Sequence, residues 1–222
     1  MKHPTPRSLG YRMPAEWEPQ EAIWLSWPHN KVTWPDGMLA EVERSYIEII
    51  RVLHTDQKIK LLVMDAEAEA RIRNILRAAG IELTPIVFFQ IATADAWIRD
   101  YGPTFVVNRK ARELAMVKWL FNAWGGKYDD LIPDNGIPLE LKPLLGLPMF
   151  EAGIVLEGGS IEVNGAGTVL TTEQCLLNKN RNPNLSRQEL ENYLKEYLNV
   201  AHVLWLREGI AGDDTDGHID DI

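Results

Sequence analysis

Five carboxylates and one histidine crowd a short stretch near the end of the sequence, between Asp213 and Asp221. Carboxylates this close cannot all stay ionised without a cation to balance them. The stretch therefore predicts either a metal site, since oxygen ligands suit calcium or magnesium, or a pocket for a cationic substrate with His218 as acid/base. The spacing is not that of an EF-hand loop, which needs glycine at its sixth position and glutamate at its twelfth. A solvated acidic loop is the third interpretation.

A second candidate site lies between two strand-like runs, in the segment from Asp95 to Pro103. Loops at strand ends carry many of the sites of α/β proteins. Asp100 stands just before Gly102-Pro103, so a rigid turn can present its carboxylate, and Trp97 can supply an apolar or cation–π wall. The alternative is a loop held by an ion pair between Arg99 and a carboxylate.

A third candidate is Glu157, which lies inside the apolar run Ile154–Val163 and is followed by two glycines. A buried carboxylate is costly unless it is paired, and glycines allow a ligand or another backbone to approach closely. The alternative is an edge strand with Glu157 in solvent and a glycine bulge. Cys175, the only cysteine, precedes two leucines, a pattern typical of a buried apolar side chain rather than a thiolate.

Alternating strand and helix patterns surround these candidates and indicate an α/β fold. Short runs rich in Ile, Val, Phe and Trp predict strands at Ala22–Trp27, Ile59–Met64, Ile86–Phe89, Thr104–Val107, Ala115–Leu120, Ile154–Val163, Thr168–Thr171 and His202–Leu206. Helical periodicity predicts helices at Met38–His54, Ala66–Ala79 and Ser186–Leu198, the last with a capping box at its start. Asn164-Gly165 predicts a hairpin, and the proline-rich segment Ile132–Pro148 a loop with at most a short helix.

The composition narrows the class of protein. The 222 residues carry 23 Lys+Arg against 32 Asp+Glu, a formal net charge of −9, and 45% are hydrophobic. An acidic balance without a basic stripe argues against nucleic-acid binding, and no apolar run approaches the ~18–20 residues of a membrane span. A single cysteine suits the reducing cytoplasm, and the glycines form no nucleotide-binding motif. We therefore expect a cytoplasmic globular protein without a nucleotide cofactor.

Six motifs in order resemble the agmatine deiminase and Porphyromonas-type peptidylarginine deiminase family, within the guanidine-modifying superfamily. They cover nearly the whole chain: Arg12–Pro19 with Trp24–Pro28, Trp97–Pro103, Phe121–Gly126, Leu156–Ile161, Asn178–Pro183 and Gly212–Asp221. The resemblance implies a pseudo-symmetric α/β propeller of five ββαβ modules, about three of which this sequence would cover. Residues 1–222 are then expected to form a deiminase catalytic domain that is truncated at its C-terminal end.

The resemblance also implies hydrolysis of the guanidinium group of agmatine to N-carbamoylputrescine and ammonia, in putrescine biosynthesis, with no cofactor and no metal. It gives His218 the acid/base role and Glu157 the role of its partner carboxylate, while Asp100 and Asp220 bind the guanidinium group, with Trp97 beside them. Near these carboxylates, the pKa of His218 is expected to be raised. In the family a cysteine thiolate attacks the guanidinium carbon. Its Gly-rich motif is absent here, and Cys175 matches a different family position.

Two other interpretations stay open from the sequence. The substrate can be peptidyl-arginine instead of agmatine, or the chain can be a cation- or metal-binding module without turnover, which the missing nucleophile and the acidic stretch suggest. The expected partner is a small guanidinium molecule, with neither nucleic acid nor membrane. The tryptophan-rich N-terminal segment is compatible with a contact in a homo-oligomer and equally with a core.

Overall fold

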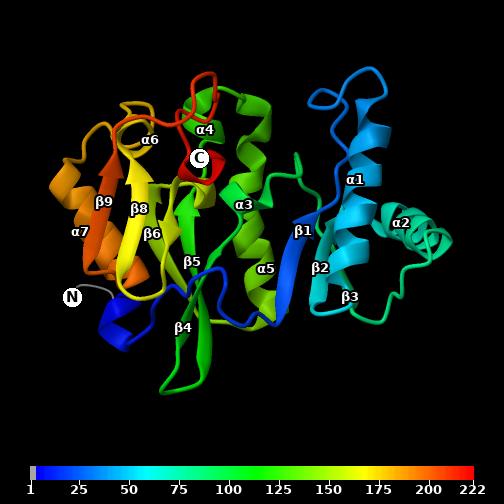
Figure 1. The fold of residues 1–222 in the computed structure, drawn as a ribbon, viewed down its shortest axis with the longest axis horizontal. Coiled ribbons are helices and arrows are strands. Elements are labelled where there is room, and N and C mark those ends of the chain that lie inside the picture. The colour runs from blue at the N-terminus through cyan, green and yellow to red at the C-terminus, as the bar shows by residue number, and fades with distance from the viewer. Residues whose placement is uncertain (1–3) are drawn as a thin grey trace. The chain divides into compact units, whose positions relative to one another are not determined.

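The computed structural model describes residues 4–222, which divide into two compact units (Figure 1). The first unit combines the residues up to Glu18 with Arg99–Ile222, and the second is Pro19–Ile98. Three-stranded sheets organise both units, one in the second unit and two in the first. The α/β class predicted from the sequence is therefore confirmed.

The second unit is a parallel sheet in the order β1-β2-β3, formed by Ala22–Ser26, Lys58–Val63 and Ile86–Gln90. Parallel strands need crossover connections, which the helices α1 (Met38–Leu53) and α2 (Ala66–Ala78) supply. Its core joins Ile59 and Leu61 of β2 to apolar residues of both helices. Helix α2 begins at Asp65, whose carboxylate accepts the backbone N–H of Ala68 at 2.7 Å.

The first unit holds two sheets with the same connectivity, an antiparallel hairpin followed by a helical crossover to a parallel third strand. The first sheet is β4 (Thr104–Asn108), β5 (Glu113–Leu120) and β6 (Met149–Val155), and its crossover contains α4 (Ala123–Gly126), the 3-10 helix Asp129–Gly136 and α5 (Ile137–Leu145). The second sheet is β7 (Glu162–Val163), β8 (Thr168–Thr172) and β9 (His202–Leu206), and its crossover contains α6 (Glu173–Leu176) and α7 (Arg187–Leu198).

Short helical turns complete the first unit, and helix α7 anchors its core. The turns are the 3-10 helix Arg7–Leu9, α3 (Ile98–Tyr101), and the 3-10 turns Gly158–Ser160 and Ile219–Asp221. Helix α7 starts with the predicted capping box, in which Ser186 and Glu189 exchange hydrogen bonds. Its buried stripe of leucines packs in one cluster with Val117 of β5 and Val169 of β8.

Residues 132–148, predicted as a loop with at most a short helix, contain the nine-residue helix α5, whose first turn includes Pro138, where the missing N–H of proline costs no hydrogen bond. One segment differs from the sequence-based predictions. The strand predicted over Ile154–Val163 is interrupted: β6 already begins at Met149, and the glycines at 158 and 159 form a 3-10 turn before β7. The hairpin at Asn164-Gly165 is confirmed between β7 and β8. Across residues 4–222, the helices are all too short or too polar to span a bilayer.

Candidate active site

The titratable and charged side chains of the candidate site lie in segments that follow or precede strands of the first unit. Glu157 follows the end of β6, Arg181 follows β8 and α6, and the loop that carries His218 follows β9. Because β5 is parallel to β6 and β8 is parallel to β9, the segments that follow these strands leave each sheet at the carboxyl ends of its parallel strands. Asp100 precedes β4, which runs antiparallel to β5 and therefore starts near the carboxyl end of β5. Figure 1 shows α3, α4 and the C-terminal turn at this end of the first unit.

Asp100 is a buried carboxylate with both oxygens bound. Oδ1 accepts the backbone N–H of Gly159 at 2.9 Å, and Oδ2 accepts the indole N–H of Trp124 at 3.0 Å. Burial raises the pKa of Asp100 to about 6, although these two hydrogen bonds oppose the rise. Two neutral N–H donors therefore hold the carboxylate of Asp100 in place. The alternative predicted for this segment was an ion pair between Arg99 and a carboxylate. That ion pair is also present, between Arg99 and Glu16.

Glu157 is fully buried, so the alternative of an edge-strand carboxylate in solvent is wrong. Its Oε1 accepts the Arg181 Nε–H at 2.7 Å, while Oε2 has no hydrogen-bond partner. Burial raises the pKa of Glu157 to about 7, and the nearby guanidinium of Arg181 acts in the opposite direction. A buried carboxylate with a free oxygen is poised to accept one more donor.

His218 lies 2% exposed among three carboxyl groups. Its Nδ1 is 3.8 Å from Asp100 Oδ1 and 3.7 Å from Asp220 Oδ1, and its Nε2 has no hydrogen-bond partner. The expectation of a raised pKa is wrong: the pKa of His218 is lowered, because burial outweighs the attraction of Asp220. The imidazole is therefore biased towards its neutral form.

Asp220 shares the cluster but is more accessible, with its side chain 30% exposed. It lies on the 3-10 turn Ile219–Asp221, and its carboxylate is 3.6 Å from Arg99 Nε. Burial and the neighbouring Asp100 raise the pKa of Asp220 to about 6. Both acidic groups keep raised pKa values although Arg99 lies near them, which indicates a place for a further cation.

Gly159 marks the point at which these side chains converge. A Cβ atom built on it would lie 2.5 Å from His218 Nδ1, 2.8 Å from Asp100 Oδ1 and 2.8 Å from Asp220 Oδ2. Carbon atoms do not approach polar atoms this closely without displacing them. Glycine is therefore required here by close approach, as the sequence predicted for the glycines that follow Glu157.

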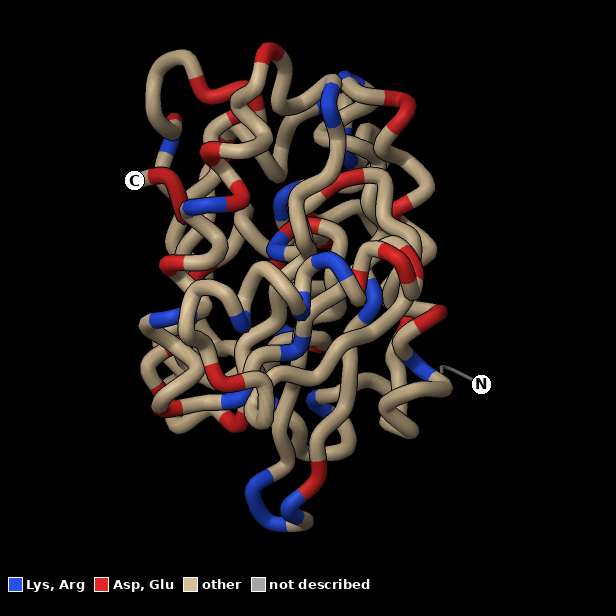
Figure 2. Tube along the Cα trace, turned by 90° about the vertical axis from the view of Figure 1, so that its right-hand side faces the viewer, with Lys and Arg blue, Asp and Glu red and all other residues tan. Residues whose placement is uncertain are grey.

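The acidic stretch is largely paired with donors of the protein itself. Asp213 accepts the backbone N–H groups of Thr215, Gly217 and His218. Asp214 accepts the phenolic O–H of Tyr128, and Asp216 pairs with Lys127 and Arg181. Figure 2 shows acidic residues next to the C-terminal label. These bonds shape the loop around His218, so most of the stretch is neither a cation cage nor a solvated loop.

Arg181 is a site residue that the residue types alone do not predict. Its side chain is fully buried and bonds Glu157, Asp216, the Asn180 side chain and the backbone carbonyl of Thr215. Its only signal in the sequence is its place in Asn178–Pro183, one of the six motifs of the family resemblance. The interactions that explain its burial lie 24 and 35 residues away along the chain.

Cys175 is buried in the core below the site, as the sequence predicted. One ligand atom each of Cys175, Glu157 and His218 lies within 4.8 Å of the others, a spacing at which a metal ion can be held. Burial and the charge of Glu157 raise the pKa of the thiol well above its usual value, and Arg181 occupies Oε1 of Glu157. A protonated thiol beside a guanidinium is a poor cation site, so we assign no metal to these residues.

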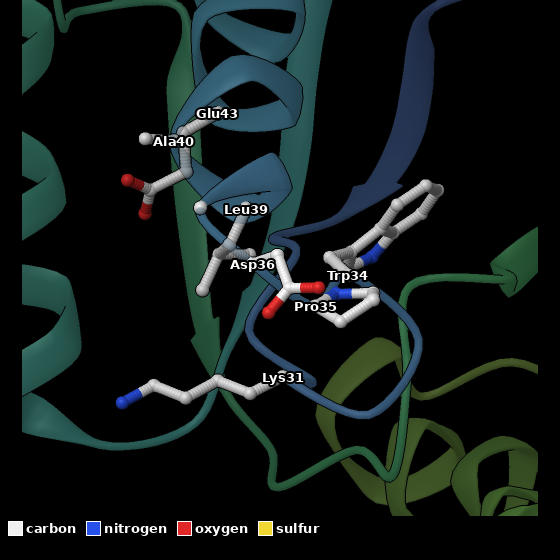
Figure 3. A pocket seen from close by; sticks show the side chains of 8 residues that line it. Lys31, Trp34, Pro35, Asp36, Leu39, Ala40 and Glu43 are labelled. Carbon is white, nitrogen blue, oxygen red and sulfur yellow. The ribbon is translucent and has the colours of Figure 1, made fainter.

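Trp97 belongs to the second unit, where its ring centroid lies 5.7 Å from that of Trp34. Its predicted contact with substrate stays a prediction. The same unit contains a pocket between the loop after β1 and the first turns of α1 (Figure 3), lined by Lys31, Trp34, Pro35, Asp36, Gly37, Leu39, Ala40 and Glu43. Of the predicted site residues, none lines this pocket.

Comparison with known proteins gives one consistent family. The sequence profile described as "Porphyromonas-type peptidyl-arginine deiminase" matches residues 12–222. The chain is 40% identical over 222 residues to the agmatine deiminase of Ectopseudomonas mendocina, covering 97% of this chain and 58% of that protein. Its structure is similar to the agmatine deiminase of Enterococcus faecalis, with a TM-score of 0.88, 36% identity and coverage of 100% and 61%. It is also similar to the substrate-bound agmatine deiminase of C. jejuni, with a TM-score of 0.81, 34% identity and coverage of 95% and 60%. The chain thus spans about three fifths of the length of these relatives.

Proposed function

Because the chain belongs to the Porphyromonas-type peptidyl-arginine deiminase family, we propose that it serves the hydrolysis of agmatine to N-carbamoylputrescine and ammonia. The observation that carries this proposal is the convergence of Asp100, Asp220 and His218 around Gly159, with a carboxylate oxygen of Glu157 within 4.8 Å of a ring nitrogen of His218. The similarity to proteins named agmatine deiminase supports agmatine as the substrate.

The two aspartates suit a guanidinium ligand. A guanidinium group is planar, stays charged and carries five N–H donors, so carboxylates bind it through paired hydrogen bonds. Asp100 and Asp220 both have pKa values raised to about 6, because Asp100 is buried, Asp220 is partly shielded from water, and the two carboxylates lie near each other. A bound guanidinium would supply positive charge and favour the ionised form of both carboxylates. We assign substrate binding to Asp100 and Asp220, and a contact of Trp97 with substrate stays a proposal from the sequence.

His218 is proposed to move the protons of the reaction, with Glu157 as its partner. A neutral imidazole takes the proton of an attacking thiol and gives it to the departing ammonia as the carbon–nitrogen bond breaks. It then takes a proton from water, which attacks the thioether-linked carbon and releases the thiol and the urea product. Glu157 would accept a hydrogen bond from the imidazole and stabilise its charged form. The thiol is not Cys175, whose pKa is raised far above neutrality by burial.

The fold supports a modular architecture. Two sheets of the first unit repeat the ββαβ order of strands and helices. We propose that these sheets, with the β1-β2-β3 sheet, correspond to three modules of a five-module propeller. In that arrangement, residues 1–222 are part of one deiminase domain that acts on a small guanidinium substrate.

Peptidyl-arginine is the second candidate substrate, because the matched family profile carries that activity in its description. The discriminating measurement is ammonia release from agmatine, free arginine and an arginyl peptide, using an active protein that carries this segment. A clear preference for the peptide would refute agmatine as the substrate.

Binding to the 222-residue chain tests the site directly. Titration calorimetry should detect agmatine but not putrescine, which has the same aliphatic chain without the guanidinium group. Asp100→Asn and Asp220→Asn should each weaken agmatine binding, since a hydrogen bond to a charged group contributes about 1.5–3 kcal/mol. The control Asp56→Asn changes an exposed aspartate of the second unit and should bind normally. Equal binding of agmatine and putrescine would refute the proposed site.

A further inference from the structure

Arg181 joins the two segments that bear the proposed proton-transfer pair. Its Nε donates to Glu157 Oε1 at 2.7 Å, its Nη1 to Asp216 Oδ2 at 2.7 Å, and its Nη2 to the backbone carbonyl of Thr215 at 2.8 Å. Glu157 follows β6, whereas Thr215 and Asp216 belong to the loop just before His218. A fully buried guanidinium thus connects the carboxylate to the imidazole's own loop.

One oxygen of Glu157 and one ring nitrogen of His218 remain without a hydrogen-bond partner. Arg181 occupies Oε1 of Glu157, so Oε2 is the oxygen without a partner. Nδ1 of His218 faces Asp100 and Asp220, so Nε2 is the nitrogen without a partner. A carboxylate oxygen of Glu157 and a ring nitrogen of His218 lie within 4.8 Å of each other. Oε2 and Nε2 are therefore the atoms available to form a Glu157–His218 hydrogen bond.

We propose that Arg181 is a positioning residue for this pair: it favours the ionised form of the Glu157 carboxylate and turns it so that Oε2 can accept the Nε2–H of His218. The consequence is that the neutral imidazole leaves its Nδ1 lone pair directed at Asp100 and Asp220, where the substrate is proposed to bind. The catalytic meaning of this arrangement rests on the proposed function, whereas the arrangement itself can be measured without substrate.

Charge and shape both explain why an arginine occupies this position. Glu157 and Asp216 are carboxylates on either side of the guanidinium, and a buried charge is costly unless it is paired and hydrogen-bonded. The planar guanidinium donates in three directions at once, which the compact ammonium of lysine cannot do in the same geometry. Without this charge Glu157 would take up a proton from water and stay protonated, and its carboxyl O–H would donate a hydrogen bond to Nε2, so the neutral imidazole would carry its own proton on Nδ1. The His218 tautomer would then be reversed.

Imidazole tautomers provide the test. Long-range proton–nitrogen NMR spectra of the ¹⁵N-labelled chain distinguish Nε2–H from Nδ1–H, and carboxyl ¹³C shifts follow the titration of Glu157. Above the Glu157 pKa of about 7, where the carboxylate is ionised, we expect the wild type to carry the neutral His218 proton on Nε2. In Arg181→Met the proton should move to Nδ1, and the pKa of Glu157 should rise by about 1 to 3, as on removal of an adjacent opposite charge. Arg181→Lys should raise the Glu157 pKa by less, because it keeps the charge.

Two controls separate positioning from general stability. Arg187→Met removes a surface ion pair with Glu173 and should leave the His218 tautomer unchanged. In a Glu157→Gln background, Arg181→Met should cause no further change at His218, because coupled residues are not additive. The titration must account for the other groups that act on the imidazole or lie within its reach: Asp100 of α3, Asp220 and Asp221 of the C-terminal turn, Asp213 of the loop, and Cys175 of α6.

Each outcome decides the inference. An unchanged tautomer and an unchanged Glu157 pKa in Arg181→Met would overturn it, as would additive effects of Arg181→Met and Glu157→Gln. Should Arg181→Met not fold, Arg181→Lys gives the decision, and a Glu157 pKa equal to that of the wild type overturns the proposal. Agmatine added to the same wild-type sample tests the proposed function separately. If His218 signals do not respond to agmatine, the proposed function fails while the effect of Arg181 on Glu157 stands.

Discussion

Replacement of Gly159 by alanine is the sharpest perturbation of the proposed site. The added methyl carbon would lie 2.5 Å from His218 Nδ1 and 2.8 Å from an oxygen of each of Asp100 and Asp220. The backbone at Gly159 does not adopt a left-handed conformation, so the substitution introduces a steric effect without backbone strain. All three polar groups must move away from the point at which they converge.

The expected cost has two parts. Overpacking of a well-packed region lowers the free energy of unfolding by about 1–3 kcal/mol. Displacement of one carboxylate from a charge-assisted contact costs about 1.5–3 kcal/mol of binding free energy, which corresponds to roughly a 10- to 150-fold increase in the agmatine Kd. Both quantities should therefore change in Gly159→Ala.

Urea unfolding and titration calorimetry measure the two effects on the same protein sample. Gly136→Ala is the matched control, because no atom lies within 4 Å of its added methyl group and its φ is negative. That variant should bind agmatine normally and unfold with a free energy equal to or slightly above that of the wild type. If Gly159→Ala retains both wild-type stability and wild-type agmatine affinity, the three side chains do not converge as described, and the site assignment fails.

Three further predictions concern proton transfer, pH and the thiol. In an active protein that carries this segment, His218→Ala should reduce kcat by about 100- to 10,000-fold with a smaller effect on agmatine binding; wild-type kcat would remove His218 from the mechanism. The pKa of Glu157 is raised to about 7 and that of Asp100 to about 6, so these two groups hold protons in the folded state that the unfolded chain has lost, and their contribution to the free energy of unfolding should fall as pH rises from about 4 to 7. Urea titrations of Asp100→Asn should show a shallower fall than the wild type; an identical slope would show that Asp100 does not titrate as described. Finally, the purified 222-residue chain should release no ammonia from agmatine, because the Cys175 thiol stays protonated; release that disappears in Cys175→Ser would contradict this prediction.

Local patterns in the sequence determined much of the secondary structure. Strands such as Thr168–Thr172 and helices such as Arg187–Leu198 follow from apolar periodicity and from a capping box, which are interactions between residues close in the chain. Residues 132–148 carry four prolines and were predicted as a loop with at most a short helix; α5 is that helix, with Pro138 in its first turn, which accommodates proline, and Pro143 further inside. The strand predicted to run through Glu157 was wrong because two glycines there form a turn that local apolarity does not reveal.

Residue types also identified the side chains of the candidate site, but not their electrostatic state. Asp100, Glu157, His218 and Asp220 stand out in the sequence as charged or titratable groups in unusual surroundings, and the family resemblance linked them. The sequence could not determine the sign of the shift in the His218 pKa. That sign depends on how much water the fold removes from the imidazole and how far each carboxylate lies from it. It likewise could not single out Arg181, because the partners that explain a buried guanidinium come from segments 24 and 35 residues away. Burial and long-range pairing are properties of the tertiary structure. They depend on which segments the sheets bring together at the ends of their strands.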